Sequence, residues 1–175
     1  MSVELRRARL ADADFLQELI TDEDTRPFLG GRAGDTHEDV IAEIERSDRE
    51  PDAFGWFVFE VDGEPVGCAA FHRVNERHRI AEAGRFAIHP SVRGRGVGID
   101  AARAFQRYLL GDLGFHRVEL QIYGFNERAL AHAERCGYVR EGVKRRAYLR
   151  DGEWQDAVVF SLLREDAGGR VASRA

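Results

Sequence analysis

The 175 residues predict a single α/β domain in which helices pack on a mixed β-sheet. Segments with apolar residues at every second position alternate with segments of helical spacing, in the order β-α-α-β-β-β-α-β-α-β-β. Two pairs of strand-like segments are separated by only a few residues that include Asp-Gly, which is typical of tight hairpins and not of regular βαβ repeats. An apolar fraction of 43% is sufficient for a buried core in a chain of this length.

Three signals near the start of the chain predict one strand followed by two helices. Asp12 and Asp14 favour a helix N-terminus, because acidic side chains stabilise the positive end of the helix dipole. Thr36 and Asp39 have the spacing of a capping box, which predicts that a second helix begins there. We therefore expect a strand over 3–8, a helix after Asp12 that breaks within 26–31, and a second helix after Thr36.

The rest of the chain is predicted to contain two hairpins and a further strand, helix, strand and helix between them. Asp62-Gly63 and Asp151-Gly152 each separate two strand-like runs and predict tight turns. Residues 165–175 contain few apolar side chains, so we expect one folded domain over 1–164 and a flexible tail over 165–175. The expected elements are strands over 56–61, 65–71 and 80–88, a helix over 98–110, a strand over 117–125, a helix over 126–136, and strands over 138–149 and 153–163.

The charge balance excludes one class of partner and suggests others. The chain has 31 acidic and 26 basic side chains and a net charge of −5, which predicts no nucleic-acid partner. Residues 1–52 hold 15 acids and 7 bases, whereas residues 53–175 hold 16 acids and 19 bases. This asymmetry is compatible with a cationic ligand near the first part and an anionic ligand near the second, and equally with acids on solvent-exposed helix faces.

Neither a membrane nor a metal is predicted as a partner. No apolar run approaches the roughly 20 residues that a membrane span needs. The first residues lack the apolar stretch of a signal peptide, so we expect a cytoplasmic location. Cys68 and Cys136 are too few for a disulfide scaffold, and no Cys-x-x-Cys or His-Glu-x-x-His spacing indicates a zinc site.

A glycine-rich segment between a predicted strand and a predicted helix has the strongest chemical signal. Its glycines let the backbone approach a ligand closely. The amides at a helix start have no intrahelical partner and carry the positive end of the helix dipole, and two arginines add fixed positive charge. These features predict a site for a pyrophosphate-sized anion, formed by Arg93, Gly94, Arg95, Gly96, Val97 and Gly98.

Several classes of ligand could use such a segment. A P-loop is excluded because the segment does not end in Gly-Lys-Ser or Gly-Lys-Thr. Residues 96–101 fit the Gly-x-Gly-x-x-Ala dinucleotide pattern, but they begin eight residues after Ile88, and two hairpins do not suit a doubly wound sheet. A coenzyme A thioester is the third class, and an ordinary strand-to-helix turn is the alternative without a ligand.

Arg93-x-x-Gly96-x-Gly98, opening a helix after a strand, resembles the GNAT acetyltransferase superfamily. The stretches 118–122, 126–129 and 136–138 agree with this resemblance. The ending over 141–145 and 151–156 is similar to the branch of ribosomal-protein N-terminal and spermidine acetyltransferases. The resemblance covers residues 3–164 and implies the GNAT fold, an α/β fold with a mixed central sheet of about seven strands flanked by four helices.

This resemblance implies acetyl-CoA as the cosubstrate, without a metal. The amides of residues 93–98 would hold its pyrophosphate, and the backbones of Phe86 and Ile88 would pair with the pantetheine arm. A backbone N–H near Ile88 would bind the oxyanion of the reaction. Asn126 would hydrogen-bond the pantetheine, although asparagine is also a good helix N-cap. We further expect Arg93→Ala to weaken acetyl-CoA binding with little change in the melting temperature of the free protein.

Acetyl transfer to an amine needs a proton acceptor, and Glu82 is our first candidate. Alternation along the strand before the loop places four residues on one face: Glu82, Gly84, Phe86 and Ile88. A simply exposed glutamate, or one paired with Arg79, would give the same pattern. Glu119 and the acidic residues 22–24 are weaker candidates.

The chain departs from the family pattern at Ala133, where many members have a tyrosine that protonates the departing thiolate. Water can protonate this group, since an ordinary thiol has a pKa near 8.5, so we expect slower turnover. Tyr123 and His132 are possible substitutes, and Cys136 is predicted to be a packing residue.

The sequence thus predicts a CoA-dependent N-acetyltransferase that acts by direct attack of a primary amine on acetyl-CoA. The acceptor is expected to be a protein N-terminus, a polyamine or another small amine, and a homodimer is possible. The alternative is a GNAT-fold module that binds acetyl-CoA and transfers nothing.

Overall fold

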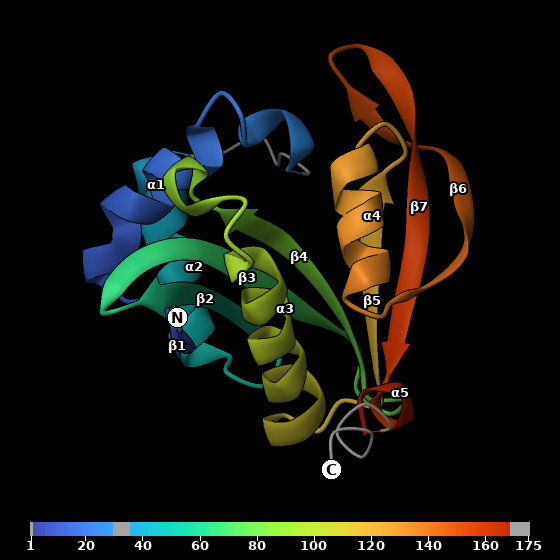
Figure 1. Ribbon diagram of the computed structural model, residues 1–175, viewed down its shortest axis with the longest axis horizontal. Coiled ribbons are helices and arrows are strands. Elements are labelled where there is room, and N and C mark those ends of the chain that lie inside the picture. The colour runs from blue at the N-terminus through green and yellow to red at the C-terminus, as the bar shows by residue number, and fades with distance from the viewer. Residues whose placement is uncertain (1, 30–35, 169–175) are drawn as a thin grey trace. The chain divides into compact units, whose positions relative to one another are not determined.

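The computed structural model describes residues 2–29 and 36–168 and confirms the expected mixed α/β fold (Figure 1). Seven strands form a sheet in the order β1-β2-β3-β4-β5-β7-β6. The chain divides into two compact units, Met1–Arg73 with Ala83–Phe105, and Val74–Glu82 with Gln106–Ala175. Strand β4 (Ile80–Ile88) contributes residues to both units.

In the first unit, antiparallel strands carry helices on both faces (Figure 1). Strand β1 pairs with β2, and β2 pairs with β3 through the predicted Asp-Gly turn. The elements are β1 (Val3–Arg7), α1 (Ala13–Thr21), α2 (His37–Arg49), β2 (Phe54–Val61), β3 (Glu64–Asn75) and α3 (Val97–Arg107).

Alternation along β2 sends its side chains into two different apolar layers. Trp56 and Val58 pack with the buried faces of α1 and α2. Phe57 and Phe59 point to the other face, where their ring centroids lie 5.6 Å and 6.4 Å from that of Phe105 in α3. Helix α3, which follows the predicted anion loop, is therefore anchored on the sheet by aromatic rings.

The structure contains the capping box and the tight hairpin turn that the sequence predicts. The Asp39 amide donates to Thr36 Oγ1 at 3.2 Å and the Thr36 amide donates to Asp39 Oδ2 at 3.1 Å, which confirms the capping box. Asp62 and Gly63 have φ angles of 53° and 82°, the left-handed pair that a two-residue hairpin turn of this kind needs.

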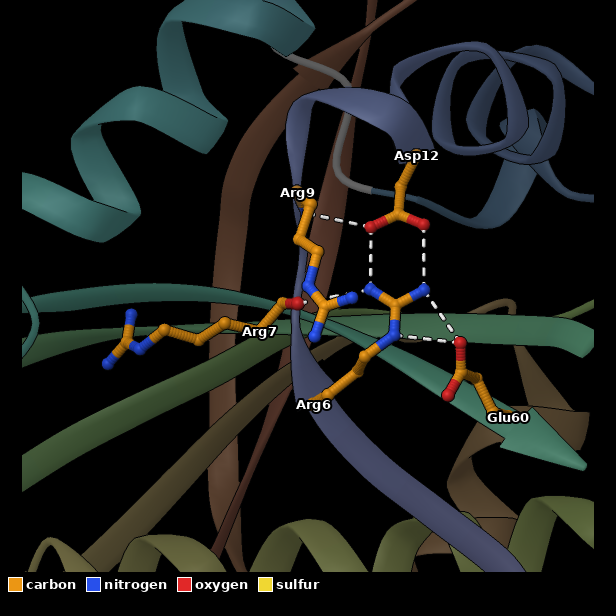
Figure 2. Close-up of polar contacts among 5 residues, drawn as sticks. All are labelled: Arg6, Arg7, Arg9, Asp12 and Glu60. Carbon is orange, nitrogen blue, oxygen red and sulfur yellow. Dashed lines mark hydrogen bonds and ion pairs between the residues drawn. The ribbon is translucent and has the colours of Figure 1, made fainter. Parts of the chain in front are cut away.

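Asp12 has a second role that its place at a helix start did not predict (Figure 2). Its carboxylate, in a residue only 8% exposed, accepts hydrogen bonds from Arg6 Nη1 at 2.6 Å, Arg6 Nη2 at 2.8 Å and the Arg9 amide at 2.7 Å. Arg6 Nε also donates to Glu60 at 2.7 Å. Burial alone would raise the pKa of Asp12, but the hydrogen bonds from Arg6 and Arg9 outweigh it and hold that pKa below its usual value.

The second unit contains a parallel strand pair followed by an antiparallel hairpin. Ile80–Glu82 of β4 pair in parallel with the start of β5, and β5 pairs with β7, which pairs with β6. The further elements are the π-helical turn η4 (Tyr108–Asp112), β5 (Arg117–Tyr123), α4 (Glu127–Arg135), β6 (Val139–Arg150), β7 (Glu153–Leu163) and α5 (Arg164–Gly168).

Strand ends shift by a few residues, the most at β3, which runs to Asn75 and not to residue 71, and three further parts of the chain differ from those expected. The predicted helix over 98–110 ends as α-helix at Arg107 and continues as the π turn η4, in which the Leu113 amide donates to the Tyr108 carbonyl at 2.9 Å. Strand β5 stops at Tyr123 and not at residue 125, since the chain turns there and the Gly124 amide donates to the Asp156 carbonyl.

The third difference concerns the predicted tail. The structure shows helix α5 at its beginning, where the Leu163 amide donates to the Asp166 carboxylate at 3.1 Å and the Arg164 amide to the His116 carbonyl at 3.0 Å. Residues 169–175 lie outside the described part of the chain. Within the described residues, no helix is long and apolar enough to cross a membrane.

Strand β4 has the predicted bounds but not the predicted regularity. Arg85 in its middle has a φ of 50°, a left-handed conformation that interrupts an extended strand and is typical of a bulge. The Arg85 guanidinium forms an ion pair with Glu43 and lies 4.8 Å from the ring centroid of Trp56, while its carbonyl accepts from Cys68 Sγ. These contacts hold the bulge in place three residues before Ile88.

Candidate active site

The glycine-rich segment forms a continuous turn into α3 in the first unit. Gly94 and Gly96 have φ angles of 79° and 82°, which residues with a Cβ rarely adopt. The Ile99 and Asp100 amides donate back to the Gly96 carbonyl at 3.0 Å and 3.3 Å. The amides from Gly94 to Gly98 precede these bonds and lie at the positive end of the α3 dipole. The geometry therefore suits an anion with several oxygens.

The two arginines of the turn have different surroundings. Arg93 is half-buried, and its Nε donates to the Ile88 carbonyl at 2.8 Å while its Nη2 donates to Thr25 Oγ1 at 2.8 Å. Arg95 is exposed, next to the open positions of Gly94 and Gly96. Arg95 is thus the arginine placed for contact with a ligand, whereas Arg93 joins the turn to β4 and to the segment after α1.

The Arg93 contacts change one expectation from the sequence. Thr25 is 4% exposed and its hydroxyl also donates to Asp22 Oδ1 at 2.9 Å, so Arg93 connects the loop to the acidic segment 22–24 within the same unit. Loss of Arg93 would remove two hydrogen bonds, one of them to the buried Thr25. We therefore expect Arg93→Ala to lower the melting temperature of the free protein, contrary to the sequence-based prediction.

Phe86 and Ile88 lie on the last part of β4, in the first unit. The ring centroid of Phe86 is 5.5 Å from that of Phe59. Strand β3 approaches this part of β4 closely, because a Cβ at Gly67 would lie 2.5 Å from the Ala87 carbonyl oxygen and 2.8 Å from Ile88 Cδ1. The backbone near Ile88 is thereby fixed, as a backbone donor for an oxyanion must be.

Glu82 lies in the second unit, within a polar cluster. Its carboxylate accepts a hydrogen bond from Gln121 Nε2 of β5, and among the described residues it forms no ion pair with Arg79. Gln121 Oε1 accepts from Tyr148 at 3.0 Å and from Lys144 at 3.1 Å, both on β6. The Gln121 amide engages one oxygen of the carboxylate, and the second oxygen can accept a further hydrogen bond.

Gln121, Lys144 and Tyr148 were not singled out from the sequence. Alternation in β5 places Gln121 on the same face as Glu119 and Tyr123, which was the available signal for Gln121. Lys144 is the single lysine of the chain, which was the signal for that residue.

The weaker candidates for the base have other partners. Glu119 forms an ion pair with Arg117 at 2.7 Å, and Arg117 also pairs with Glu141. Hydrogen bonds from Arg117 and Ser161 lower the pKa of Glu141 to about 2. The Glu119 carboxylate is thus held by the Arg117 guanidinium, whereas Glu82 accepts from the neutral amide of Gln121.

Asn126 is the N-cap of α4 in the second unit. Its Oδ1 accepts from the Ala129 amide at 3.1 Å, and the residue is 6% exposed. This cap uses the carbonyl oxygen only, so the N–H donors of the side chain are not needed for it. The structural role is confirmed, and the ligand role stays a prediction.

The residues considered as proton donors to the thiolate have contrasting environments. Ala133 is buried at 2% exposure. Burial, followed by the charge of Arg135, lowers the pKa of His132, so its imidazole is neutral at neutral pH and has no ready proton to give. Tyr123 is 7% exposed beneath Phe125 and Tyr148, with centroid distances of 5.0 Å and 5.4 Å. None of the three is a clear donor.

The cysteines are packing residues. Cys68 and Cys136 are both buried and free. Burial raises the pKa of the Cys68 thiol to about 11, so it carries no reactive thiolate at neutral pH. In the described part of the chain, no group of three or more His, Cys, Asp and Glu side chains could hold a metal ion.

Comparison with known proteins matches residues 2–139 to the family described as the acetyltransferase (GNAT) domain. The putative ribosomal N-acetyltransferase YdaF of Bacillus subtilis is 31% identical over 108 residues, which are 62% of this chain and 58% of that protein. The ribosomal protein uS5-alanine N-acetyltransferase of Escherichia coli is 28% identical over 119 residues, 67% of this chain and 61% of that protein. The chain thus spans somewhat more than half the length of these relatives.

The fold is also that of solved structures. Spermidine N-acetyltransferase from Vibrio cholerae, in complex with CoA and spermine, superimposes with a TM-score of 0.84 at 22% identity. The match covers 95% of this chain and 98% of the other. At this identity the likeness concerns the fold and not the substrate.

Proposed function

Because the chain belongs to the GNAT acetyltransferase family, we propose that it is an N-acetyltransferase that moves the acetyl group of acetyl-CoA to a primary amine. The observation that carries the proposal is the turn over 94–98, whose glycines and helix-end amides are suited to a pyrophosphate. In this proposal Arg95 contacts the pyrophosphate, Phe86, Ile88 and Asn126 bind the pantetheine arm, and Arg93 holds the turn in shape.

Glu82 is the proposed base. It accepts a proton from the substrate ammonium, and the freed nitrogen lone pair attacks the thioester carbonyl carbon. The C–N bond forms and the C–S bond breaks, the new amide nitrogen releases its extra proton to solvent, and the departing thiolate takes a proton from water. A backbone N–H near Ile88 stabilises the oxygen that becomes negative during the attack.

The acceptor is proposed to be a cationic amine, either a polyamine or a protein N-terminus. The named activities of the relatives, on spermidine and on the alanine of a ribosomal protein, support these two classes. The exposed Glu23 and Asp24 and the excess of acids over residues 1–52 favour a cationic partner as well. The cytoplasmic location and the homodimer stay predictions.

Release of free thiol from acetyl-CoA tests the proposal. With a panel of polyamines, small amines and peptides with free N-termini, at least one acceptor should produce thiol in step with acetylated amine. The buried Ala133, in place of a tyrosine, supports a second candidate, an acetyl-CoA-binding module. Calorimetric binding of acetyl-CoA without thiol release across the panel would favour the module, and absence of binding would reject both.

Substitution of the two loop arginines should separate binding from stability. We expect Arg95→Ala to weaken acetyl-CoA binding by roughly 10-fold, because it removes one charge-assisted contact worth about 1.5 kcal/mol. The melting temperature without ligand should not change, since Arg95 is exposed. Arg93→Ala should lower both the affinity for acetyl-CoA and the melting temperature of the free protein. Calorimetry and thermal unfolding of the two variants check this, and unchanged affinity of Arg95→Ala would contradict the assigned loop.

A further inference from the structure

The Gln121 side chain lies at the centre of the polar cluster of the second unit. Its Nε2 donates to Glu82, while its Oε1 accepts from both Tyr148 and Lys144. Hydroxyl and ammonium groups can both donate, and an ammonium can only donate. The amide oxygen must therefore face β6, and the amide N–H groups must face Glu82. The two β6 residues determine which end of the amide meets the carboxylate.

We propose that Gln121 is a positioning residue for Glu82, and that Lys144 and Tyr148 hold Gln121 in the orientation that donates to the carboxylate. The inference rests on the proposed function, because it assumes that Glu82 is the base. A glutamate side chain has several rotatable bonds, and the hydrogen bond from Gln121 restricts them. Correct placement of a reacting group contributes strongly to rate.

Lys144 is notable because the other basic residues among the 26 are arginines. A guanidinium is planar and binds best in pairs of parallel hydrogen bonds, whereas an ammonium is a compact donor suited to a single amide oxygen. The only lysine of the chain is thus found where a single-point contact to Gln121 is made, at 3.1 Å.

The charges around Glu82 make the proposal testable by pH. From β6, Lys144 contributes a positive charge and Tyr148 a neutral hydroxyl, whose pKa is raised by burial and by the negative charge of Glu82. From β5, Glu119 is the ladder neighbour of Glu82, and its charge is paired with Arg117. Of these groups, Lys144 is the cation linked to the carboxylate through Gln121, so its removal should make protonation of Glu82 easier.

The experiment measures kcat/KM against pH with the best acceptor of the panel. Gln121→Leu should lower kcat by about 10- to 100-fold through loss of positioning. Gln121→Glu places a second carboxylate beside Glu82 and should move the acidic limb of the profile upward by about one pH unit. Lys144→Met should move the acidic limb upward by less than Gln121→Glu does, because Lys144 is exposed and its charge is partly screened. Lys144→Arg keeps the positive charge and should leave the limb close to its wild-type position.

Arg145→Met is the matched control, since it removes the same charge from an exposed neighbouring position on β6. It should leave the acidic limb in place. A limb that moves as far in Arg145→Met as in Lys144→Met, or full activity in Gln121→Leu, would overturn the proposal. Loss of stability alone would lower the yield of folded enzyme without moving the limb.

A second measurement does not need turnover. The side-chain amide resonance of Gln121, followed by NMR, should titrate with Glu82 and lose this titration in Glu82→Gln. Its midpoint should rise in Lys144→Met. If no acceptor is acetylated but this titration is seen, the proposed function fails and the Gln121–Glu82 contact stands. If the resonance does not follow Glu82, the positioning role is wrong whatever the enzyme does.

Discussion

Replacing Glu82 by glutamine is expected to lower kcat for amine acetylation by about 10²- to 10⁴-fold, the usual contribution of a general base. The substitution keeps the size of the side chain and removes its ability to take a proton from the substrate ammonium. Steady-state thiol release measures the loss. Binding of acetyl-CoA by calorimetry should be unchanged, since Glu82 is assigned to the acceptor amine and not to the cofactor.

Glu119→Gln is the control for this prediction. Glu119 is the neighbour of Glu82 in the β4–β5 ladder, and its carboxylate pairs with Arg117. We expect Glu119→Gln to affect turnover far less than Glu82→Gln. If Glu119→Gln abolishes activity and Glu82→Gln retains it, the base has been assigned to the wrong strand.

The largest effect on stability is expected for Asp12→Ala, which should lower the free energy of unfolding by about 3 kcal/mol. The variant leaves the partly buried Arg6 without its main partner and the Arg9 amide without an acceptor (Figure 2). Urea unfolding gives the free energy. Asp14→Ala, at the same helix start, removes a side chain that is 94% exposed and pairs with the exposed His37 at 2.9 Å, so it should cost less than about 0.5 kcal/mol. Equal losses in the two variants would show that the contacts of Asp12 with Arg6 and Arg9 add nothing to the stability of an acid at this helix start.

The ion pair between Arg6 and Asp12 makes the stability of the protein depend on pH, with a definite sign. The pKa of Asp12 is lower in the folded protein than its unfolded value of about 3.9. Its stabilising contribution is therefore fully present above about pH 4 and is lost as the pH falls through the folded pKa. The difference in stability between the wild type and Asp12→Ala should be constant near neutral pH and shrink under acid.

The elements that could be predicted are those whose signals are local. The hairpin turns at Asp62 and Asp151 require two successive left-handed residues, and Asp-Gly supplies them. The capping box at Thr36 is complete within four residues. The bounds of β4 were predicted correctly because its flanking loops are visible in the sequence, although the alternation expected along it is interrupted at Arg85.

The features that could not be predicted depend on residues distant in the sequence. Alternation predicted that Glu82 shares a face with Phe86 and Ile88, but the strand is interrupted at Arg85 between them. Nothing local indicated that Gln121, 39 residues after Glu82, donates to it, or that Lys144, 62 residues after Glu82, donates to Gln121. The bulge at Arg85 depends on contacts with Glu43 and Cys68 from other elements. A motif likewise identifies Arg93 without showing that its guanidinium is already bonded to Ile88 and Thr25.

Strand β6 lies at the end of the strand order, so one side of its backbone is a template to which a foreign strand could add. Its side chains include Arg140, Lys144, Arg145, Arg146 and Arg150, and the ladder to β7 is interrupted where Arg146 takes a φ of 49°. Two copies meeting through this edge would place like charges opposite one another on a distorted backbone. This arrangement disfavours the edge-to-edge pairing through which exposed strands assemble into fibrils.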